Sequence, residues 1–152
     1  MSEELFKEAI RHCRWKYAVK SVIPKIQLKQ PAGTTFDKVF EMVHALTAPV
    51  EGVGLLSTYD LASAVCRYNR IPIKRVYIIG EGPQKAIKYL GLTTASQKIG
   101  SVTLKYVTVD QVKNSKLRLP LPPHLKNTTD GDALETFLCN WQKPLTRAYD
   151  LC

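Results

Sequence analysis

The stretch P-V-E-G-V-G-L-L-S-T-Y-D, residues 49–60, places two glycines around one valine directly before a run with helical spacing. Gly52 and Gly54 can adopt a positive φ and put no Cβ between the backbone and a partner. Apolar residues recur at intervals of three and four on both sides of them, which predicts helices over residues 36–47 and 56–69. The sequence therefore predicts two neighbouring helices joined by a tight turn centred on Gly52 to Gly54.

A helix, an apolar-Gly-apolar-Gly turn and a second helix form the pattern of a helix-hairpin-helix. The N–H groups just after such a turn have no acceptor within the helix, and the helix dipole favours an anion there. A phosphate site is one interpretation, with Gly52, Val53, Gly54 and the Ser57 hydroxyl as its ligands. The other interpretation is a purely structural turn, because short motifs of this kind also occur without a ligand.

The rest of the chain predicts a mainly α, compact helical domain that spans residues 1–152. Capping residues, helical spacing and one alternating run decide the individual segments. The expected elements are an N-terminal helix at 3–21, a helix-hairpin-helix core at about 36–69, a helix at about 83–90, at most a short strand or extended segment near 101–109, and a C-terminal helix at about 131–142.

The chain carries 22 Lys and Arg residues against 13 Asp and Glu residues, which gives a net charge of +9. Such a charge favours a polyanion partner. Six basic residues crowd into one segment, where Glu81 is the only acid and Tyr68 and Tyr77 lie among them. These are Arg67, Arg70, Lys74, Arg75, Lys85 and Lys88. Interleaved basic and aromatic residues can grip a phosphate chain, although the same pattern also fits an ordinary solvated surface.

The four cysteines, at 13, 66, 139 and 152, form no C-x-x-C pair and have no histidine at metal-ligand spacing. We therefore expect reduced thiols, no metal site and no cofactor. No apolar run approaches the roughly 20 residues that span a bilayer, so a membrane is not among the expected partners. These features predict an intracellular, cytoplasmic protein.

The segment L-T-A-P-V-E-G-V-G-L-L-S-T, residues 46–58, resembles the hairpin of the endonuclease III type DNA glycosylases, which has the form L-P-G-V-G-x-K-T-A. The resemblance covers about residues 36–76. It implies an all-helical fold, backbone amides on a DNA phosphate, and hairpin carbonyls that can hold a monovalent cation. Leu56 stands where bifunctional members have a nucleophilic lysine, and residues 73–77 hold no carboxylate in place of the family's aspartate. Glycosylase activity is therefore not expected.

The chain also resembles a set of short proteins of no assigned activity, which share a G-[IV]-G-x-L-x-x-Y-D hairpin. Gly52 to Asp60, Val76-Tyr77-Ile78 and Phe137-Leu138-Cys139 fit that set. The sequence thus favours a non-catalytic protein that binds DNA or RNA through its phosphate backbone, without sequence specificity. Two rival hypotheses remain open: a repair enzyme with an atypical catalytic set, and a protein-interaction module in which the glycines serve only packing.

Overall fold

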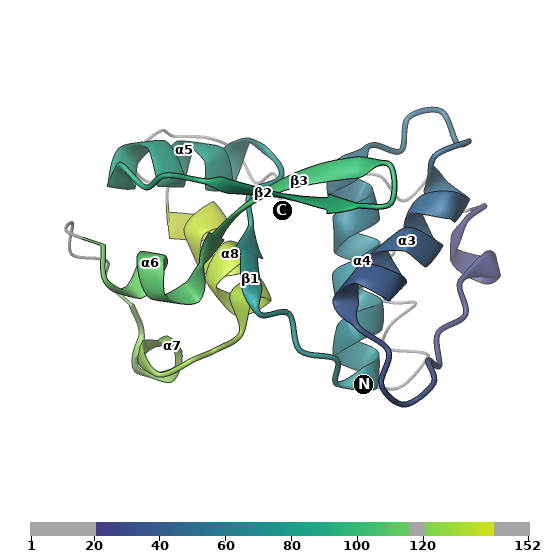
Figure 1. Cartoon of the computed structure of the whole chain (residues 1–152), viewed down its shortest axis with the longest axis horizontal. Helices are drawn as coiled ribbons and strands as arrows, with labels where there is room; N and C mark the ends of the chain where they lie inside the picture. The colour runs from purple at the N-terminus through teal and green to yellow at the C-terminus, as the bar shows by residue number, and fades with distance from the viewer. Residues whose placement is uncertain (1–20, 116–120, 142–152) are drawn as a thin grey trace. The chain divides into compact units, whose positions relative to one another are not determined.

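The computed structural model describes residues 21–115 and 121–141. The chain divides into two compact units between Pro72 and Ile73 (Figure 1). The helix expected at 3–21 lies almost entirely outside the described residues. The single domain expected from the chain length remains a prediction.

The first unit contains the two expected helices. A 3-10 turn, η1 (Ile23–Lys25), precedes α3 (Phe36–Thr47), and α4 (Leu55–Asn69) follows the glycine turn. The Thr35 hydroxyl caps α3 by accepting a hydrogen bond from the N–H of Lys38 at 3.4 Å. Both helices have the bounds predicted from the sequence to within one residue, so this part of the prediction is confirmed.

Aromatic and hydroxyl contacts hold α3 and α4 together. The rings of Phe36 and Tyr59 meet edge to face, with centroids 6.0 Å apart, and both residues are buried. Nearer the turn, the hydroxyls of Thr47 and Thr58 share a buried hydrogen bond of 2.7 Å. Because a buried hydroxyl must find a partner, this bond fixes how the two helices meet just below the glycines.

The second unit contains a three-stranded antiparallel sheet with β3 in the centre, between β1 and β2. Its strands are β1 (Arg75–Tyr77), β2 (Ala95–Ile99) and β3 (Val102–Thr108). Its helices are α5 (Glu81–Leu90), α6 (Val109–Lys113), α7 (Pro123–Lys126) and α8 (Gly131–Trp141). In the register, Tyr77 pairs with Tyr106 and Gln97 pairs with Leu104.

This sheet shows that the expectation of a mainly α fold is wrong, because the described residues form a mixture of helices and an antiparallel sheet. The segment expected near 101–109 is the central strand rather than an isolated one. Its partner β2 reads Ala-Ser-Gln-Lys-Ile and lacks the apolar alternation that indicates a strand. Gly100 and Ser101 form a two-residue loop between the paired Ile99 and Val102, and Gly100 has a φ of 59°. Glycine followed by serine is a hairpin signal that could have identified β2.

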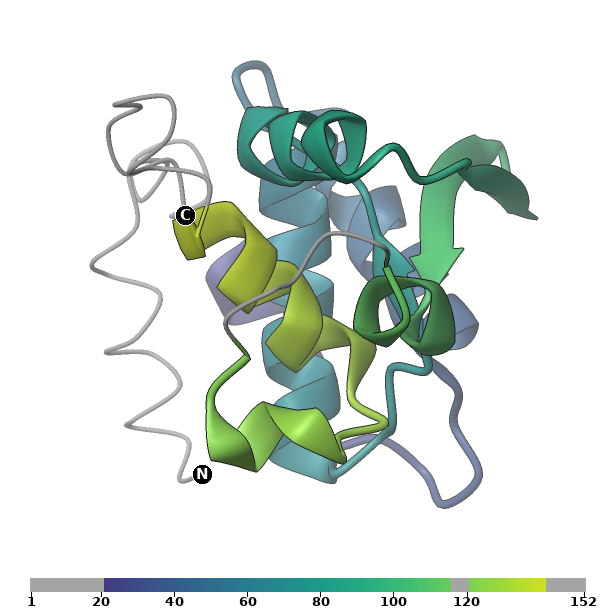
Figure 2. The same cartoon turned by 90° about the vertical axis from the view of Figure 1, so that its left-hand side faces the viewer.

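One face of the sheet packs against helices. Val76 of β1 and Val107 of β3 join buried residues of α5 and α8 in a single apolar core. In Figure 2 these two helices face the viewer. The core contains Val76, Ile78, Ala86, Ile87, Leu90, Val107, Val109, Val112, Leu125, Leu134 and Leu138. Leu134 and Leu138 confirm the apolar face predicted for the last helix, whereas Phe137 and Trp141 are only partly buried there.

The start of α8 lies directly on β1. Asp130 caps the helix, because one of its carboxylate oxygens accepts hydrogen bonds from the N–H groups of Asp132 at 3.0 Å and Ala133 at 3.3 Å. The N–H of Gly131 donates to the carbonyl of Ile73 at 2.7 Å. A Cβ added at Gly131 would overlap the carbonyl group of Arg75, so only glycine fits at this position.

We predict that Gly131→Ala destabilises the second unit by about 3 kcal/mol, near the upper end of the usual cost of overpacking. The clash is with backbone, so no side-chain rotation can relieve it, and either β1 or α8 must move. Urea unfolding followed by circular dichroism measures the loss.

Gly54→Ala is the matched control for this substitution. Gly54 has a negative φ of −94°, and no heavy atom lies within 4 Å of the place where its Cβ would be. Its cost is expected to stay near 1 kcal/mol or below, the usual effect of alanine at a helix N-cap. Equal midpoints for the two variants would show that Gly131 tolerates a side chain.

Candidate nucleic-acid interface

The glycine turn leads from α3 into α4 through a short loop. The N–H of Val50 donates to the carbonyl of Thr47 at 2.9 Å, and the N–H of Val53 donates to the carbonyl of Val50 at 3.3 Å. Gly52 is exposed and has a φ of 85°, which favours glycine. The loop is thus held by its own backbone hydrogen bonds and needs the first glycine for its conformation.

Gly54 is the N-cap residue of α4, and no side chain caps this helix end. The first helical hydrogen bond runs from the N–H of Thr58 to the carbonyl of Gly54 at 3.1 Å. No described residue accepts a hydrogen bond from the N–H of Leu55, Leu56 or Ser57. These donors lie at the positive end of the helix dipole, which is the arrangement that binds phosphate groups in other helices.

The surface next to these donors is open. No heavy atom lies within 4 Å of where a Cβ of Gly54 would be, and Leu55 is 41% exposed. Ser57 is different, since it is only 7% exposed and faces the interior. Of the four residues expected to hold a phosphate, the two glycines are exposed, Val53 is half-buried, and the Ser57 hydroxyl does not lie at the surface.

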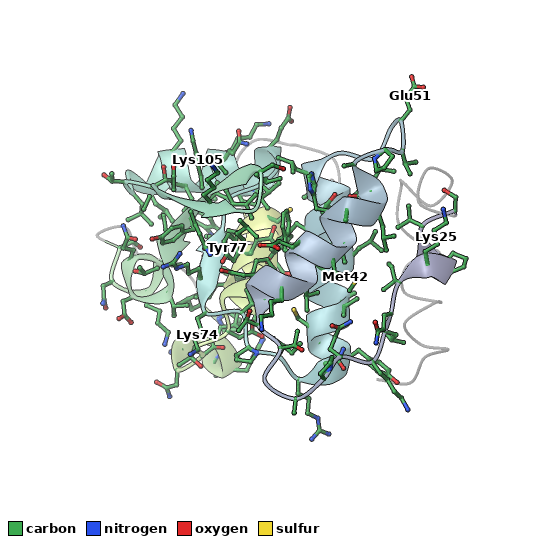
Figure 3. The ribbon with its side chains drawn as sticks, turned by 45° about the vertical axis from the view of Figure 1, so that its right-hand side comes forward. Lys25, Met42, Glu51, Lys74, Tyr77 and Lys105 are labelled. Carbon is green, nitrogen blue, oxygen red and sulfur yellow. The ribbon has the colours of Figure 1, made fainter. Side chains whose placement is uncertain are left out.

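A carboxylate marks the tip of the loop. Glu51 is exposed, and Figure 3 shows its side chain at the outer end of the loop, directed away from both helices. A negative charge beside a phosphate is unfavourable. Any anion that reaches the N-terminus of α4 therefore does so against the charge of Glu51.

Two of the expected basic residues lie far from the turn. Arg67 is in the last turn of α4 and Arg70 is its C-cap residue. At the rise of an α-helix, the sixteen steps from Gly54 to Arg70 correspond to about 24 Å. Arg70 also has a left-handed backbone, with φ 56° and ψ 37°. The structure does not bring these two arginines to the glycine turn.

The other four basic residues belong to the second unit. Lys74 is exposed just before β1, and Lys85 and Lys88 are exposed on α5. Lys85 lies 4.0 Å from the carboxylate of Glu81 one turn earlier. Residues 80–83 read Gly-Glu-Gly-Pro and form a second glycine turn before α5, in which Gly82 and Pro83 are buried. Their burial favours a structural role for this turn.

Arg75 is engaged in a clasp across the sheet. From β1 its Nη1 donates to Oε1 of Gln97 on β2 at 2.7 Å, and the Tyr77 hydroxyl donates to the same oxygen at 2.8 Å. To reach Gln97, the guanidinium passes over the ring of Tyr106 on the central strand, 4.1 Å from its centroid. These contacts give Arg75 a structural role that the sequence did not indicate, and Tyr77 is buried rather than available to a ligand.

An aromatic pair on the second unit was not predicted from the sequence. Tyr89 of α5 is 56% exposed, and its ring meets that of Trp141 on α8 with centroids 5.7 Å apart. Tyr89 follows Lys85 by four residues and lies off the apolar face of Ala86, Ile87 and Leu90. That spacing indicates, from the sequence alone, that this tyrosine lies beside the lysines on the outer side of the helix.

The structure also bears on the cysteines, on possible metal ligands and on membrane-spanning helices. Cys66 is a buried free thiol, whereas Cys139 is disulfide-bonded, which differs from the expected set of reduced thiols. Within residues 21–115 and 121–141, no three His, Cys, Asp or Glu side chains gather as metal ligands. In the same residues, every helix is too short or too polar to cross a bilayer.

No family model matches the chain, and no curated protein or solved structure is significantly similar to it.

We predict that Arg70→Gly makes the first unit about 1 kcal/mol more stable than Arg70→Ala does, because glycine avoids the cost of a Cβ in the left-handed region. Arg70→Ala removes the same charge and keeps the Cβ, so it should give no such gain. Thermal unfolding of both variants provides the comparison. A lower melting temperature for Arg70→Gly than for Arg70→Ala would contradict a strained backbone at this C-cap.

Proposed function

We propose that the chain binds nucleic acid through the phosphate backbone, without sequence specificity and without a reaction of its own. The observation that carries this proposal is the uncapped N-terminus of α4, where backbone N–H groups stand behind the open surface of Gly54. Contacts of this kind position a protein on a phosphate chain and carry no base information. The resemblance to the hairpin of the endonuclease III type glycosylases supports the same site.

The net charge of +9 supports a polyanion as the partner. Exposed cations lie in both units, among them Arg70, Lys74, Lys85 and Lys88. Charge distributed in this way raises the local concentration of a nucleic acid even where the individual residues do not contact it. An intracellular, cytoplasmic location belongs to the same proposal.

The loop also suits the monovalent cation that the resemblance implies. The carbonyl oxygen of Gly54 accepts from the N–H and the hydroxyl of Thr58. The carbonyls of Glu51, Gly52 and Val53 accept no hydrogen bond from any described residue. These three oxygens are the groups that would hold a cation, which would bring positive charge to the phosphate side of the turn.

We predict that Gly54→Asp weakens nucleic-acid binding by about 10- to 100-fold while the protein stays at least as stable. An aspartate at the N-cap accepts hydrogen bonds from the first N–H groups of a helix, and it is preferred to glycine there. It would therefore occupy the donors that the phosphate needs, each worth about 1.5–3 kcal/mol toward a charged partner. Anisotropy titrations of labelled single- and double-stranded DNA and RNA, at several salt concentrations, measure the affinity.

The salt dependence separates this effect from the loss of a cation. Gly54→Asn also occupies the first N–H groups of the helix but adds no charge, so the slope of log affinity against log salt should stay close to that of the wild type, even though the affinity falls. Gly54→Ala adds one methyl group on the same open surface but accepts no hydrogen bond, so its affinity should fall less than that of Gly54→Asn. Wild-type affinity for Gly54→Asp at every salt concentration would rule out the α4 N-terminus as the phosphate site.

We further predict that Glu51→Gln raises the affinity by about 2- to 5-fold at low salt, since it removes a like charge from the tip of the loop. The gain should shrink as salt increases, because Glu51 is exposed and its field is screened. The same titrations measure it, with Glu41→Gln on the exposed surface of α3 as the matched control. A reduced affinity for Glu51→Gln would mean that nucleic acid does not approach this loop.

A further inference from the structure

Tyr89 is unusual because it exposes a large ring without serving the core. Among the described residues only Tyr89 and Leu55 are large, apolar and exposed. The core contacts of α5 come from Ala86, Ile87 and Leu90 instead. Because 56% of Tyr89 is accessible, much of its ring surface remains open to a partner.

Trp141 fixes the orientation of this ring. The planes of Tyr89 and Trp141 meet at 65°, which is the edge-to-face geometry that aromatic pairs prefer. Trp141 is itself packed against the core to which α5 and α8 contribute. A ring that is held in this way loses little conformational freedom when a ligand stacks on it.

Two lysines share the exposed side of α5 with Tyr89. Lys85 lies four residues before Tyr89 and three before Lys88, and both spacings make side chains neighbours on a helix. Within α5 the one acid is Glu81, 4.0 Å from Lys85. The surface therefore combines an open aromatic ring with cations on one flank.

We propose that Tyr89, braced by Trp141, stacks on a base of single-stranded nucleic acid, while Lys85 and Lys88 contact the flanking phosphates. Aromatic rings beside cations bind single strands in this way, and a duplex keeps its bases stacked inside. Charge complementarity favours a nucleic acid over an uncharged apolar partner on this face. The inference rests on the proposed function and extends it from phosphate contact to a preference for single strands.

The fluorescence of Trp141 can report binding at Tyr89. It has two tryptophans, Trp15 and Trp141, so Trp15→Phe leaves Trp141 as the single tryptophan. Its fluorescence is followed during titration with a 20-nucleotide oligothymidylate, with a base-free phosphodiester of the same length, and with a 20-base-pair duplex. Anisotropy titrations of the same polymers, with Trp15 in place, give the affinities independently of that substitution.

We expect the oligothymidylate to alter Trp141 fluorescence and to bind about 5- to 150-fold more tightly than the base-free polymer, as one stacked base predicts. Tyr89→Ala should lower its affinity to that of the base-free polymer, whereas Tyr89→Phe keeps the ring and should retain it. Lys85→Gln and Lys88→Gln should each reduce the salt slope for single strands by about 0.7. Thermal melts check that all four variants are folded.

The outcomes separate the two proposals. If oligothymidylate and base-free polymer bind equally and Tyr89→Ala changes nothing, while Gly54→Asp weakens both, stacking is wrong and the phosphate site at α4 stands. If Tyr89→Ala weakens binding and Gly54→Asp does not, stacking stands and the α4 site is wrong. If polyglutamate displaces the oligothymidylate and alters Trp141 fluorescence equally well, this face binds negative charge alone and stacking is overturned. Failure to bind any polymer overturns both proposals.

Discussion

The second unit depends on the contact between Gly131 and the backbone of β1. β1 has only three residues, so few ladder hydrogen bonds hold it on β3. The start of α8 adds a hydrogen bond from Gly131 to Ile73 and packs directly on the carbonyl of Arg75. That close approach brings Leu134 and Leu138 of α8 to Val76 and Val107 of the sheet. A larger residue at position 131 would separate the helix from the strand along which the apolar core is built.

The two ends of α4 differ in what they can bind. At the N-terminus, the uncapped N–H groups and the positive end of the dipole favour an anion, and the charge of Glu51 opposes it. At the C-terminus, the dipole is negative, and cations such as Arg67 and Arg70 are favourable there without any ligand. The same explanation applies to Lys88 in the last turn of α5, and Lys85 lies 4.0 Å from the carboxylate of Glu81. The charge that first suggests a binding surface is in part a means of stabilising a helix end.

Much of the fold could be predicted from local patterns. Capped apolar periodicity correctly identified α3, α4, α5 and α8, because each helix presents one apolar face. β2 was missed because an edge strand with polar residues on both faces shows no alternation, and α6 because it is only five residues long. Thr108 and Gln111, which form the capping box of α6, could nevertheless have been identified from the sequence. For the site, the turn was predictable, but the distance of Arg70 from it and the clasp of Arg75 depend on long-range geometry.

The clasp on Gln97 also bears on how the sheet avoids mispairing. A shift of one residue in β2 would turn its side chains to the opposite face, and β2 has too few apolar residues to resist such a shift. Two donors from β1, Arg75 and Tyr77, converge on one oxygen of Gln97 across the central strand. Any slipped pairing loses both hydrogen bonds at once and leaves the guanidinium without its acceptor. The Gln97 amide thereby favours one register for a polar edge strand, as hydrophobic patterning does in other sheets. It also makes alternative pairings of this edge, including pairing with a second copy, less competitive during folding.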